Sequence, residues 1–263
     1  MAKRELGSTG LKAFPLGLGT VKLGRNRDVK YPSGFELPDV AEVERLLSEA
    51  LELGIEFFDT APAYGSSEER LGSFVAAHRD EIVLCSKAGE DWGELGSSHD
   101  FSADGLVRSV EASLRRLRTD HLDLLLLHSD GRDAQILEEG DALEGLRKIR
   151  ESGKARAVGA SVKTREGIRI ATRELDAVMA PFGVAHPELG RDLADARAAG
   201  CATIAIKVLG QGHAVEDGRD PVQVALDHVL QAEGIDLAVI GTINPLHLRD
   251  AVERARKSLE ASP

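Results

Sequence analysis

The sequence predicts an α/β fold, a (β/α)8 TIM barrel, from a recurring series of short apolar segments and from the amphipathic stretches between them. Each apolar segment is about six residues long and almost continuously apolar, as expected for a parallel strand buried on both faces. The segments occupy residues 14–19, 55–59, 82–87, 122–128, 155–161, 175–180, 202–207 and 237–241. The chain of 263 residues thus divides into units of roughly 33 residues, close to the size of a barrel unit.

Signals that start and stop helices lie between these segments. Asp39 precedes a stretch with apolar residues at helical spacing, and Gly54 ends that stretch. Ser102 precedes a second such stretch, and Asn244 followed by Pro245 predicts the start of the last helix. This alternation predicts parallel strands joined by helices that pack on the outside of the sheet.

No linker or low-complexity segment divides the chain, so we expect one domain over residues 1–263. A doubly wound open sheet is the alternative architecture, but eight even repeats favour a closed barrel. The turn sequence at residues 7–10 (GSTG) predicts a short N-terminal β-hairpin across the bottom of the barrel. Residues 22–38 form the longest segment without apolar periodicity, and we expect them to be a binding loop.

The composition limits the partners of the protein. The 33 lysines and arginines against 44 aspartates and glutamates give a net charge of −11, which argues against nucleic acid and anionic membranes. Cys85 and Cys201 lie in apolar segments and are expected to be buried and unreactive. No secretory signal or membrane-spanning run is visible in the sequence. We therefore expect a cytoplasmic protein, a monomer rather than an oligomer, that binds a small-molecule substrate.

Polar residues stand where the predicted strands end. These residues are Asp59, Lys87, His128, Ser161 and Lys207. In a barrel of this type the functional site lies at the carboxyl ends of the strands. Three consecutive strands ending in Asp, Lys and His place an acid, an amine and an imidazole around one opening, which predicts a functional site there.

The chemistry of this site is narrowed by what the sequence offers. Zinc needs three or four ligands, and Asp59 with His128 supplies two, so we predict no metal site. The sequence has no G-x-S-x-G motif of a serine hydrolase. A Schiff-base lysine at Lys87 or Lys207 remains open. Tyr64 follows Asp59 closely, and a lysine beside it would lower the pKa of the phenol and make it a proton donor to a carbonyl oxygen.

Several motifs together resemble the aldo-keto reductase family. They lie at residues 4–20, 54–65, 86–89, 124–128, 158–161 and 239–252. The resemblance implies a (β/α)8 barrel that binds NADPH or NADH and interconverts carbonyls and alcohols. It implies that Tyr64 is the general acid/base, that Lys87 lowers its pKa, that Asp59 pairs with Lys87, and that His128 orients the carbonyl.

The sequence lacks the G-x-G-x-x-G motif, which disfavours a Rossmann site for the cofactor. The contacts with the cofactor are instead implied by the resemblance. The nicotinamide side is implied to lie against Gly19, Thr20, Asp59 and Ser161. The pyrophosphate is implied to lie against Lys207, Leu209, Gly210, Gln211 and Gly212, and the adenosine phosphate against Gly241, Thr242, Asn244 and His247. Helix N-termini favour anions, which independently suits the positions of Thr242 and Asn244.

The chain departs from the family pattern at four positions. Val162 and Met179 stand where the family commonly has amide side chains that hold the nicotinamide carboxamide. Gly241 and His247 stand where it has basic residues, which predicts weak selectivity for NADPH over NADH. Two arginines of the last predicted helix could replace the missing charge: Arg249 and Arg254.

These observations predict an NAD(P)(H)-dependent oxidoreductase that interconverts an alcohol and an aldehyde, ketone or sugar-like carbonyl, with Tyr64 as general acid/base. NADPH is the expected cofactor and NADH the second candidate. One alternative is a non-catalytic barrel that senses nicotinamide nucleotides. Another is a Schiff-base lyase that uses Lys87 or Lys207.

Overall fold

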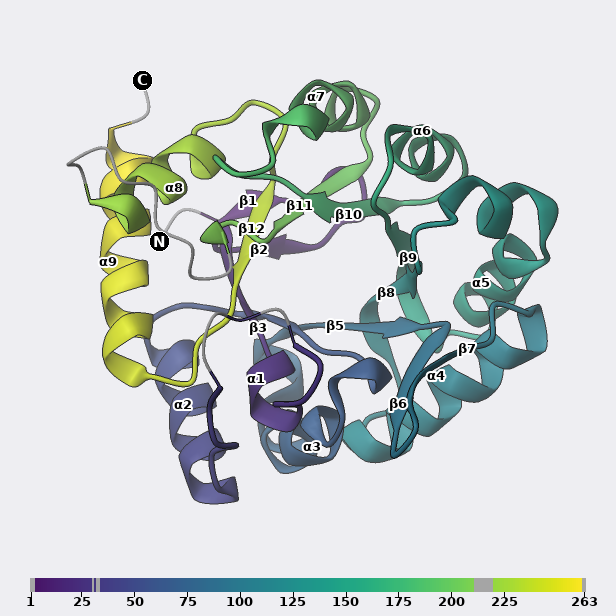
Figure 1. Cartoon of the computed structure of the whole chain (residues 1–263), viewed down its shortest axis with the longest axis horizontal. Coiled ribbons are helices and arrows are strands. Elements are labelled where there is room, and N and C mark those ends of the chain that lie inside the picture. Colours follow the sequence, from purple (N-terminus) through teal and green to yellow (C-terminus); the bar gives the residue numbers. More distant parts are fainter. Residues whose placement is uncertain (1–2, 30, 32–33, 211–219, 262–263) are drawn as a thin grey trace.

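The computed structural model describes residues 3–29, 31, 34–210 and 220–261, and within them eight parallel strands form a closed barrel (Figure 1). The barrel strands are β3 (Leu16–Gly19), β4 (Phe57–Asp59), β5 (Val83–Ala88), β8 (Leu122–His128), β9 (Ala155–Ser161), β10 (Ala177–Pro181), β11 (Ala202–Ile206) and β12 (Leu237–Ile240). Each predicted segment overlaps one of these strands. The sheet closes because β12 pairs with β3, so the prediction of a barrel is confirmed and the open sheet is excluded.

Helices surround the barrel and cover the outer face of the sheet (Figure 1). They are α2 (Val40–Glu52), α3 (Ser67–His78), α4 (Ala103–Leu117), α5 (Ala142–Glu151), α6 (Arg165–Glu174), α7 (Gly190–Ala198), α8 (Pro221–Leu230) and α9 (Pro245–Glu260). The short helix α1 (Val21–Gly24) directly follows the carboxyl end of β3. Short helical turns are η1 (Pro62–Tyr64), η2 (Arg79–Glu81), η3 (Gln135–Glu139) and η4 (Pro187–Leu189). Within the described residues, no helix is long and apolar enough to cross a membrane.

The predicted helix caps are present in the structure. The side chain of Asp39 accepts a hydrogen bond from the backbone of Glu42, whose own carboxylate accepts one from the backbone of Asp39. Ser102 and Asn244 cap α4 and α9 in the same way through their side-chain oxygens. Gly54 follows α2 with a φ of +88°, a conformation that glycine adopts without steric cost. These caps set where each helix begins or ends.

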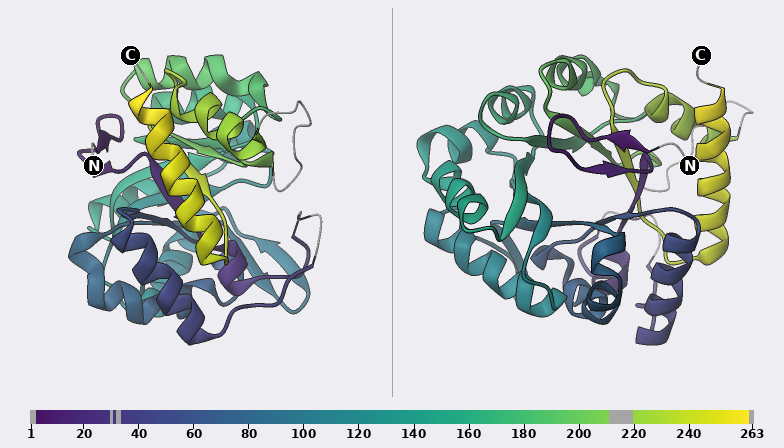
Figure 2. Two further views of the ribbon diagram at one scale, coloured as in Figure 1. Left: turned by 90° about the vertical axis from the view of Figure 1, so that its left-hand side faces the viewer. Right: turned by 180° about the vertical axis from the view of Figure 1, so that it is seen from behind.

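The N-terminal hairpin of β1 (Arg4–Glu5) and β2 (Lys12–Ala13) lies across one end of the barrel, as predicted (Figure 2). Leu6 is fully buried and packs into the interior of the barrel. The carboxylate of Asp236 accepts hydrogen bonds from the backbone of Gly7 and of Thr203, which fixes the hairpin to β11. The interior above it is apolar and includes Phe57, Leu124, Leu126, Met179, Ile204, Leu237 and Val239. The hairpin therefore closes this end, and the polar strand ends lie at the other.

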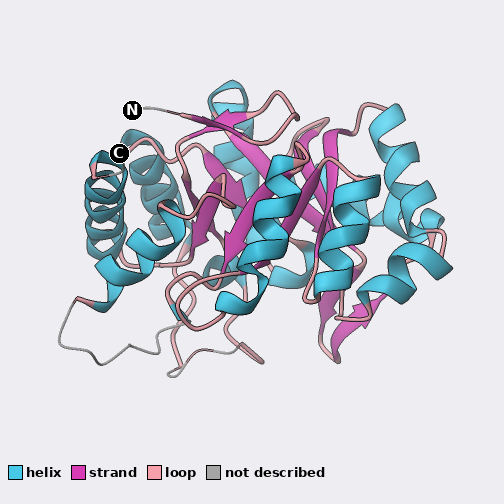
Figure 3. Ribbon diagram, turned by 90° about the horizontal axis from the view of Figure 1, so that it is seen from above, coloured by secondary structure: helices cyan, strands magenta, loops and turns pink. Residues whose placement is uncertain are grey.

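A second hairpin, β6 (Glu90–Gly93) and β7 (Gly96–His99), was not predicted, because residues 90–99 are polar and carry no apolar alternation. It follows Gly89, whose φ is +106° and whose position leaves no room for a Cβ beside the ring of Phe101. The hairpin projects from the end of the barrel opposite β1 and β2 (Figure 3). It thus forms part of the wall around the strand ends.

Candidate active site

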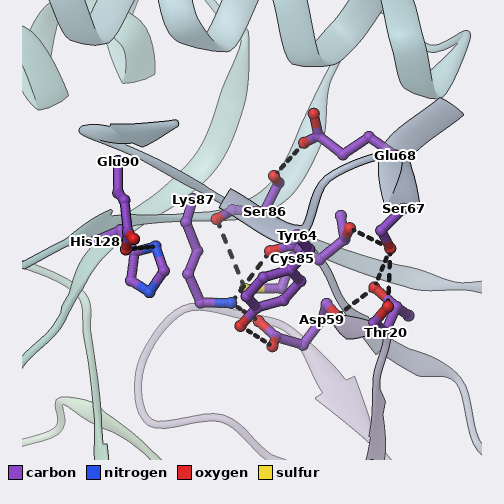
Figure 4. Close-up of polar contacts among 11 residues, drawn as sticks. Thr20, Asp59, Tyr64, Ser67, Glu68, Cys85, Ser86, Lys87, Glu90 and His128 are labelled. Carbon is purple, nitrogen blue, oxygen red and sulfur yellow. Dashed lines mark hydrogen bonds and ion pairs between the residues drawn. The ribbon is translucent and has the colours of Figure 1, made fainter. Parts of the chain in front are cut away.

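The structure brings the four predicted catalytic residues together at the carboxyl ends of the strands (Figure 4). Asp59 ends β4, Lys87 lies near the end of β5, and His128 ends β8. Tyr64 ends η1, the turn that follows β4. Because β4 pairs with β5 and β5 with β8, the three strands present these side chains side by side.

Lys87 and Asp59 form a buried ion pair. The Nζ atom of Lys87 bonds Oδ1 of Asp59 and donates a second hydrogen bond of 3.1 Å to the carbonyl oxygen of Thr60. The whole side chain of Lys87 is only 1% exposed. Burial alone would lower the pKa of this amine, but the nearby Asp59 and Tyr64 raise it above the ordinary value. Lys87 is therefore charged at neutral pH, which disfavours it as a Schiff-base nucleophile, since that reaction needs the free amine.

Tyr64 directs its phenol toward this ion pair. Its hydroxyl donates a hydrogen bond of 3.4 Å to Oδ2 of Asp59, and Nζ of Lys87 lies 4.8 Å from the ring centroid. Burial, followed by the charge of Asp59, raises the pKa of Tyr64 above its ordinary value, while Lys87 acts in the lowering direction. The prediction that Lys87 would produce a net lowering is therefore wrong in this structure, because desolvation outweighs the cation. The phenol is protonated at neutral pH and can donate its proton.

His128 packs against Tyr64 in an edge-to-face contact, with ring centroids 6.2 Å apart and the two rings nearly perpendicular. Its Nδ1 atom is 3.1 Å from Oε2 of Glu90. Burial, and then the positive charge of Lys87, hold the pKa of His128 well below its usual value. The imidazole is therefore neutral at physiological pH and presents one N–H and one lone pair.

Thr20 is buried and contacts the backbone of Asp59 instead of lining the site. Its hydroxyl donates to the carbonyl oxygen of Asp59 and accepts from the hydroxyl of Ser67, which also donates to the carbonyl oxygen of Thr20. Thr20 has no exposed surface. In this structure Thr20 holds the end of β3 against Asp59, and its place beside the nicotinamide stays a prediction.

Ser161 is the side chain next to His128 on the neighbouring strand, because the two residues are paired between β8 and β9. It is 6% exposed, and no described residue forms a hydrogen bond with its hydroxyl. Val162 and Met179 are buried, and they are joined by a backbone hydrogen bond of 2.9 Å. Val162 and Met179, which depart from the family pattern, therefore pack in the core. Ser161 is the polar side chain near the ends of β9 and β10.

Two glycines keep the space beside Asp59 free of side chains. A Cβ on Gly19 would lie 3.0 Å from Val239 and 3.9 Å from Oδ2 of Asp59, so a larger residue would crowd the site. A Cβ on Gly241 would lie 3.6 Å from the carbonyl oxygen of Gly19 and 3.8 Å from the hydroxyl of Tyr31. Gly19 at the end of β3 and Gly241 just after β12 therefore form a surface without side chains of their own, bordered by Asp59 and by the hydroxyl of Tyr31, that suits a flat ring such as nicotinamide. Tyr31 belongs to the predicted binding loop, which reaches this surface.

The predicted pyrophosphate segment follows β11 as a tight turn. The backbone N–H of Gly210 donates a hydrogen bond of 2.9 Å to the carbonyl oxygen of Lys207. Lys207 has a φ of +60°, an uncommon conformation for a residue with a side chain and one that is often found at functional sites. Leu209 packs against the hydrophobic core between barrel and helices. Gln211 and Gly212 lie outside the described residues.

The start of α9 has the geometry predicted for an anion site, but its arginines are engaged elsewhere. The hydroxyl of Thr242 accepts a hydrogen bond of 3.0 Å from the backbone of Asn244, and His247 is exposed in the first turn. Arg249 forms an ion pair with Glu49, and Arg254 forms ion pairs with Asp220 and Asp250. A phosphate would have to compete with these carboxylates for either arginine.

The two cysteines are buried as predicted. Burial raises the pKa of the Cys85 thiol well above its ordinary value and raises that of Cys201 to about 12. Both are therefore poor nucleophiles at neutral pH. Among the described residues, no group of three or more His, Cys, Asp or Glu side chains is arranged to hold a metal ion.

Arg25 of the predicted binding loop and residues of the unpredicted β6–β7 hairpin also lie at the site. Arg25 lies with its guanidinium carbon 3.5 Å from the ring centroid of Trp92 and donates a hydrogen bond of 3.0 Å to the carbonyl oxygen of Ala63. It thereby joins the loop after α1, the turn that carries Tyr64, and the β6–β7 hairpin. Glu90 faces His128 from the same hairpin. The sequence signal for these hairpin residues is the polar segment 89–96, which begins and ends with glycine and closely follows Lys87.

Comparison with known proteins agrees with this geometry. The model of the Aldo/keto reductase family matches residues 15–215. A solved structure from Pseudomonas aeruginosa, assigned as an aldo-keto reductase, is 41% identical with a TM-score of 0.88, over 98% of this chain and 96% of that one. A 6-dehydroglucose reductase from Novosphingobium aromaticivorans is 30% identical in an alignment of 261 positions, which covers 90% of this chain and 80% of the relative. An L-galactose dehydrogenase from Arabidopsis thaliana is 34% identical over 59% of this chain and 47% of its own length.

The chain therefore belongs to the aldo-keto reductase family, and the resemblance found in its sequence is confirmed. It spans about half the length of several of the curated relatives that it matches, at 45% for one Bacillus subtilis oxidoreductase and 47% for a second protein of that species.

Proposed function

We propose that the protein is an NAD(P)(H)-dependent oxidoreductase that interconverts a carbonyl and an alcohol. The observation that carries this proposal is the arrangement of Tyr64, Asp59 and Lys87 at the open end of the barrel. A protonated phenol is held there by a buried ion pair, beside a surface kept bare by two glycines. Such a phenol is placed to give a proton to a substrate oxygen.

A nicotinamide cofactor supplies the hydride when it is bound. Tyr64 acts as the general acid for reduction and, ionised, as the base for alcohol oxidation. The ion pair fixes the phenol oxygen, because Oδ2 of Asp59 accepts its hydrogen bond while Oδ1 binds Lys87. The charge of Lys87 stabilises the phenolate that forms when the proton leaves. His128 contributes a neutral imidazole at the edge of the same opening.

The residues that would hold the cofactor lie along the ends of β3, β9, β11 and β12. Gly19 and Gly241 leave room for the nicotinamide, and Ser161 offers it a hydroxyl group. The turn that begins at Lys207 and the N-terminus of α9 lie farther along this edge, and both suit phosphate groups because of backbone N–H groups and positive charge. These features support the cofactor implied by the family.

A substrate with a sugar-like carbonyl is the class we propose first. Several relatives carry names of enzymes that act on sugars, among them a D-threo-aldose 1-dehydrogenase from a Pseudomonas species. On the walls of the opening, Arg25 and Trp92 have N–H groups that can donate hydrogen bonds to hydroxyl groups of a substrate, and the carboxylate of Glu90 can accept them.

The proposed function is tested by following NADPH oxidation with a panel of aldehydes, ketones and keto sugars. We expect turnover with at least one member. NADPH binding without oxidation by any member would support the non-catalytic sensor instead. Trapping of a substrate on a lysine by borohydride, without NADPH oxidation, would support a lyase that uses Lys207.

Selectivity between the two cofactors is expected to be small. Gly241 has no side chain, and Arg249 and Arg254 are paired with carboxylates, so neither arginine can bind the 2′-phosphate of NADPH without giving up its partner. We expect kcat/KM with NADPH to be within about tenfold of that with NADH, which corresponds to about 1.4 kcal/mol. Titration of both cofactors, followed by nicotinamide fluorescence, measures this ratio. A preference of several orders of magnitude for NADPH would show that a released arginine or another cation binds the phosphate.

A further inference from the structure

A carboxylate that the proposed mechanism does not use lies beside His128. Glu90 directly follows the turn at Gly89, and its Oε2 atom is 3.1 Å from Nδ1 of His128. Its other oxygen, Oε1, accepts a hydrogen bond of 2.6 Å from the hydroxyl of Ser97 on β7. The side chains of Glu90 and His128 are only 16% and 18% exposed. The hairpin thus fixes the carboxylate with one oxygen turned toward the imidazole (Figure 4).

Nδ1 of His128 is buried, and its distance to Oε2 of Glu90 lies within the hydrogen-bond range. In this structure, however, the imidazole ring is not oriented to form a hydrogen bond through Nδ1 with any described residue. Hydrogen bonds between catalytic groups often align only when substrate binds. In an aligned ring with the proton on Nε2, the lone pair of Nδ1 would face the carboxylate, and the two electron-rich atoms would repel each other. With the proton on Nδ1, the same contact becomes a charge-assisted hydrogen bond. The contact therefore favours the tautomer protonated at Nδ1.

We propose that Glu90 is a positioning residue for His128: its carboxylate accepts the Nδ1 proton, selects that tautomer and fixes the plane of the ring. Nε2, on the opposite side of the ring from Glu90, then carries the lone pair. It can accept a hydrogen bond from a hydroxyl group of the substrate but cannot donate one to a carbonyl oxygen. This inference rests on the proposed function, and it limits how His128 can orient the carbonyl, the role that the resemblance implied. Proton donation is then left to Tyr64.

The charges around the imidazole make the contribution of Glu90 measurable. The groups that lower the pKa of His128, besides burial, come from four different elements: Lys87 on β5, Lys163 after β9, His99 on β7 and Arg25 after α1. Tyr64 faces the ring as a neutral phenol. Glu90 is the carboxylate in contact with the ring, so its removal leaves mainly positive neighbours and should lower the pKa of His128 further.

Nuclear magnetic resonance of the ¹⁵N-labelled full chain tests the proposal without requiring turnover. The imidazole nitrogen shifts report the tautomer and the pKa of each histidine, and the signals of His128 are assigned from their loss in His128→Gln. We expect the wild-type protein to carry the neutral proton on Nδ1. In Glu90→Ala this tautomer preference is lost and the pKa falls, whereas Glu90→Asp, which keeps the charge, restores part of the pKa. Glu94→Ala, at the exposed tip of the same hairpin, is the matched control and should behave like wild type.

A wild-type imidazole protonated at Nε2, or a tautomer and pKa unchanged in Glu90→Ala, would overturn the proposal. Kinetics give a second readout: kcat/KM in Glu90→Ala should fall by about 10–100-fold, the loss seen when a metal-binding histidine is deprived of the partner that orients it. Reduction and oxidation should fall together, since both pass through one transition state. Because the resonance experiment does not depend on activity, failure of the proposed function would leave its outcome interpretable.

Discussion

Replacement of Tyr64 by phenylalanine is expected to lower turnover by about 10²–10⁴-fold, because it removes the group that we propose protonates the substrate oxygen. Phenylalanine keeps the ring, which lies over the ammonium of Lys87 and against the edge of His128. The hydroxyl loses its long hydrogen bond of 3.4 Å with Asp59 and its contact with Lys87, while Asp59 and Lys87 keep each other as partners, so the free energy of unfolding should change little. Steady-state turnover at saturating cofactor and substrate measures the effect.

The affinity of Tyr64→Phe for NADPH should remain close to that of the wild-type protein, because the phenol faces the ion pair rather than the bare surface at Gly19 and Gly241. A large loss of cofactor affinity with intact turnover at saturation would mean that Tyr64 shapes the cofactor site and is not the proton donor.

Replacement of Lys87 by methionine should have the second largest effect, on both stability and the pH profile. Methionine has a similar length but leaves the carboxylate of Asp59 buried without its cation, which costs about 3–5 kcal/mol of unfolding free energy. Lys87 is also the group that lowers the pKa of Tyr64, against burial and Asp59, so this pKa should rise further in the variant. In the proposed mechanism the rate of alcohol oxidation increases as Tyr64 ionises, and that increase should therefore move to higher pH.

The double variant Asp59→Asn, Lys87→Met separates the two effects. It removes both charges, so it should recover part of the stability lost in Lys87→Met, since no uncompensated carboxylate is left. It also removes the contribution by which Asp59 raises the pKa of Tyr64, and the pH profile should shift back toward lower pH. If the profile of Lys87→Met coincides with that of the wild-type protein, the proposed coupling between lysine and phenol is wrong.

The barrel could be predicted from the sequence because a parallel strand covered on both faces must be apolar along its whole length. Segments such as 122–128 show this pattern, and a polar residue at their ends stands out against it. The ends of β4, β5 and β8 then meet at one opening by topology alone. Asp59, Lys87 and His128 were therefore found together, and the caps at Asp39, Ser102 and Asn244 follow equally local rules.

The remaining features depend on distances across the fold that no local pattern encodes. The net pKa of Tyr64 is set by how much water the folded site excludes, and Thr20 is buried because Ser67 and Asp59 surround it. The β6–β7 hairpin pairs two polar segments around a turn, so it lacks the apolar alternation that marks most strands. Glu90 is next to His128 only because that hairpin folds over the opening.

The hairpin of β1 and β2 lies at the far end of the barrel from Tyr64, so a label or a linker can be attached there away from the candidate site. Lys12 projects into solvent there, while Cys85 and Cys201 are enclosed by the core. A cysteine in place of Lys12 would therefore be the thiol that a fluorophore or a surface linker reaches first. Molecules attached in this way would all present their catalytic face to the solution, an arrangement suited to single-molecule recording or immobilised synthesis.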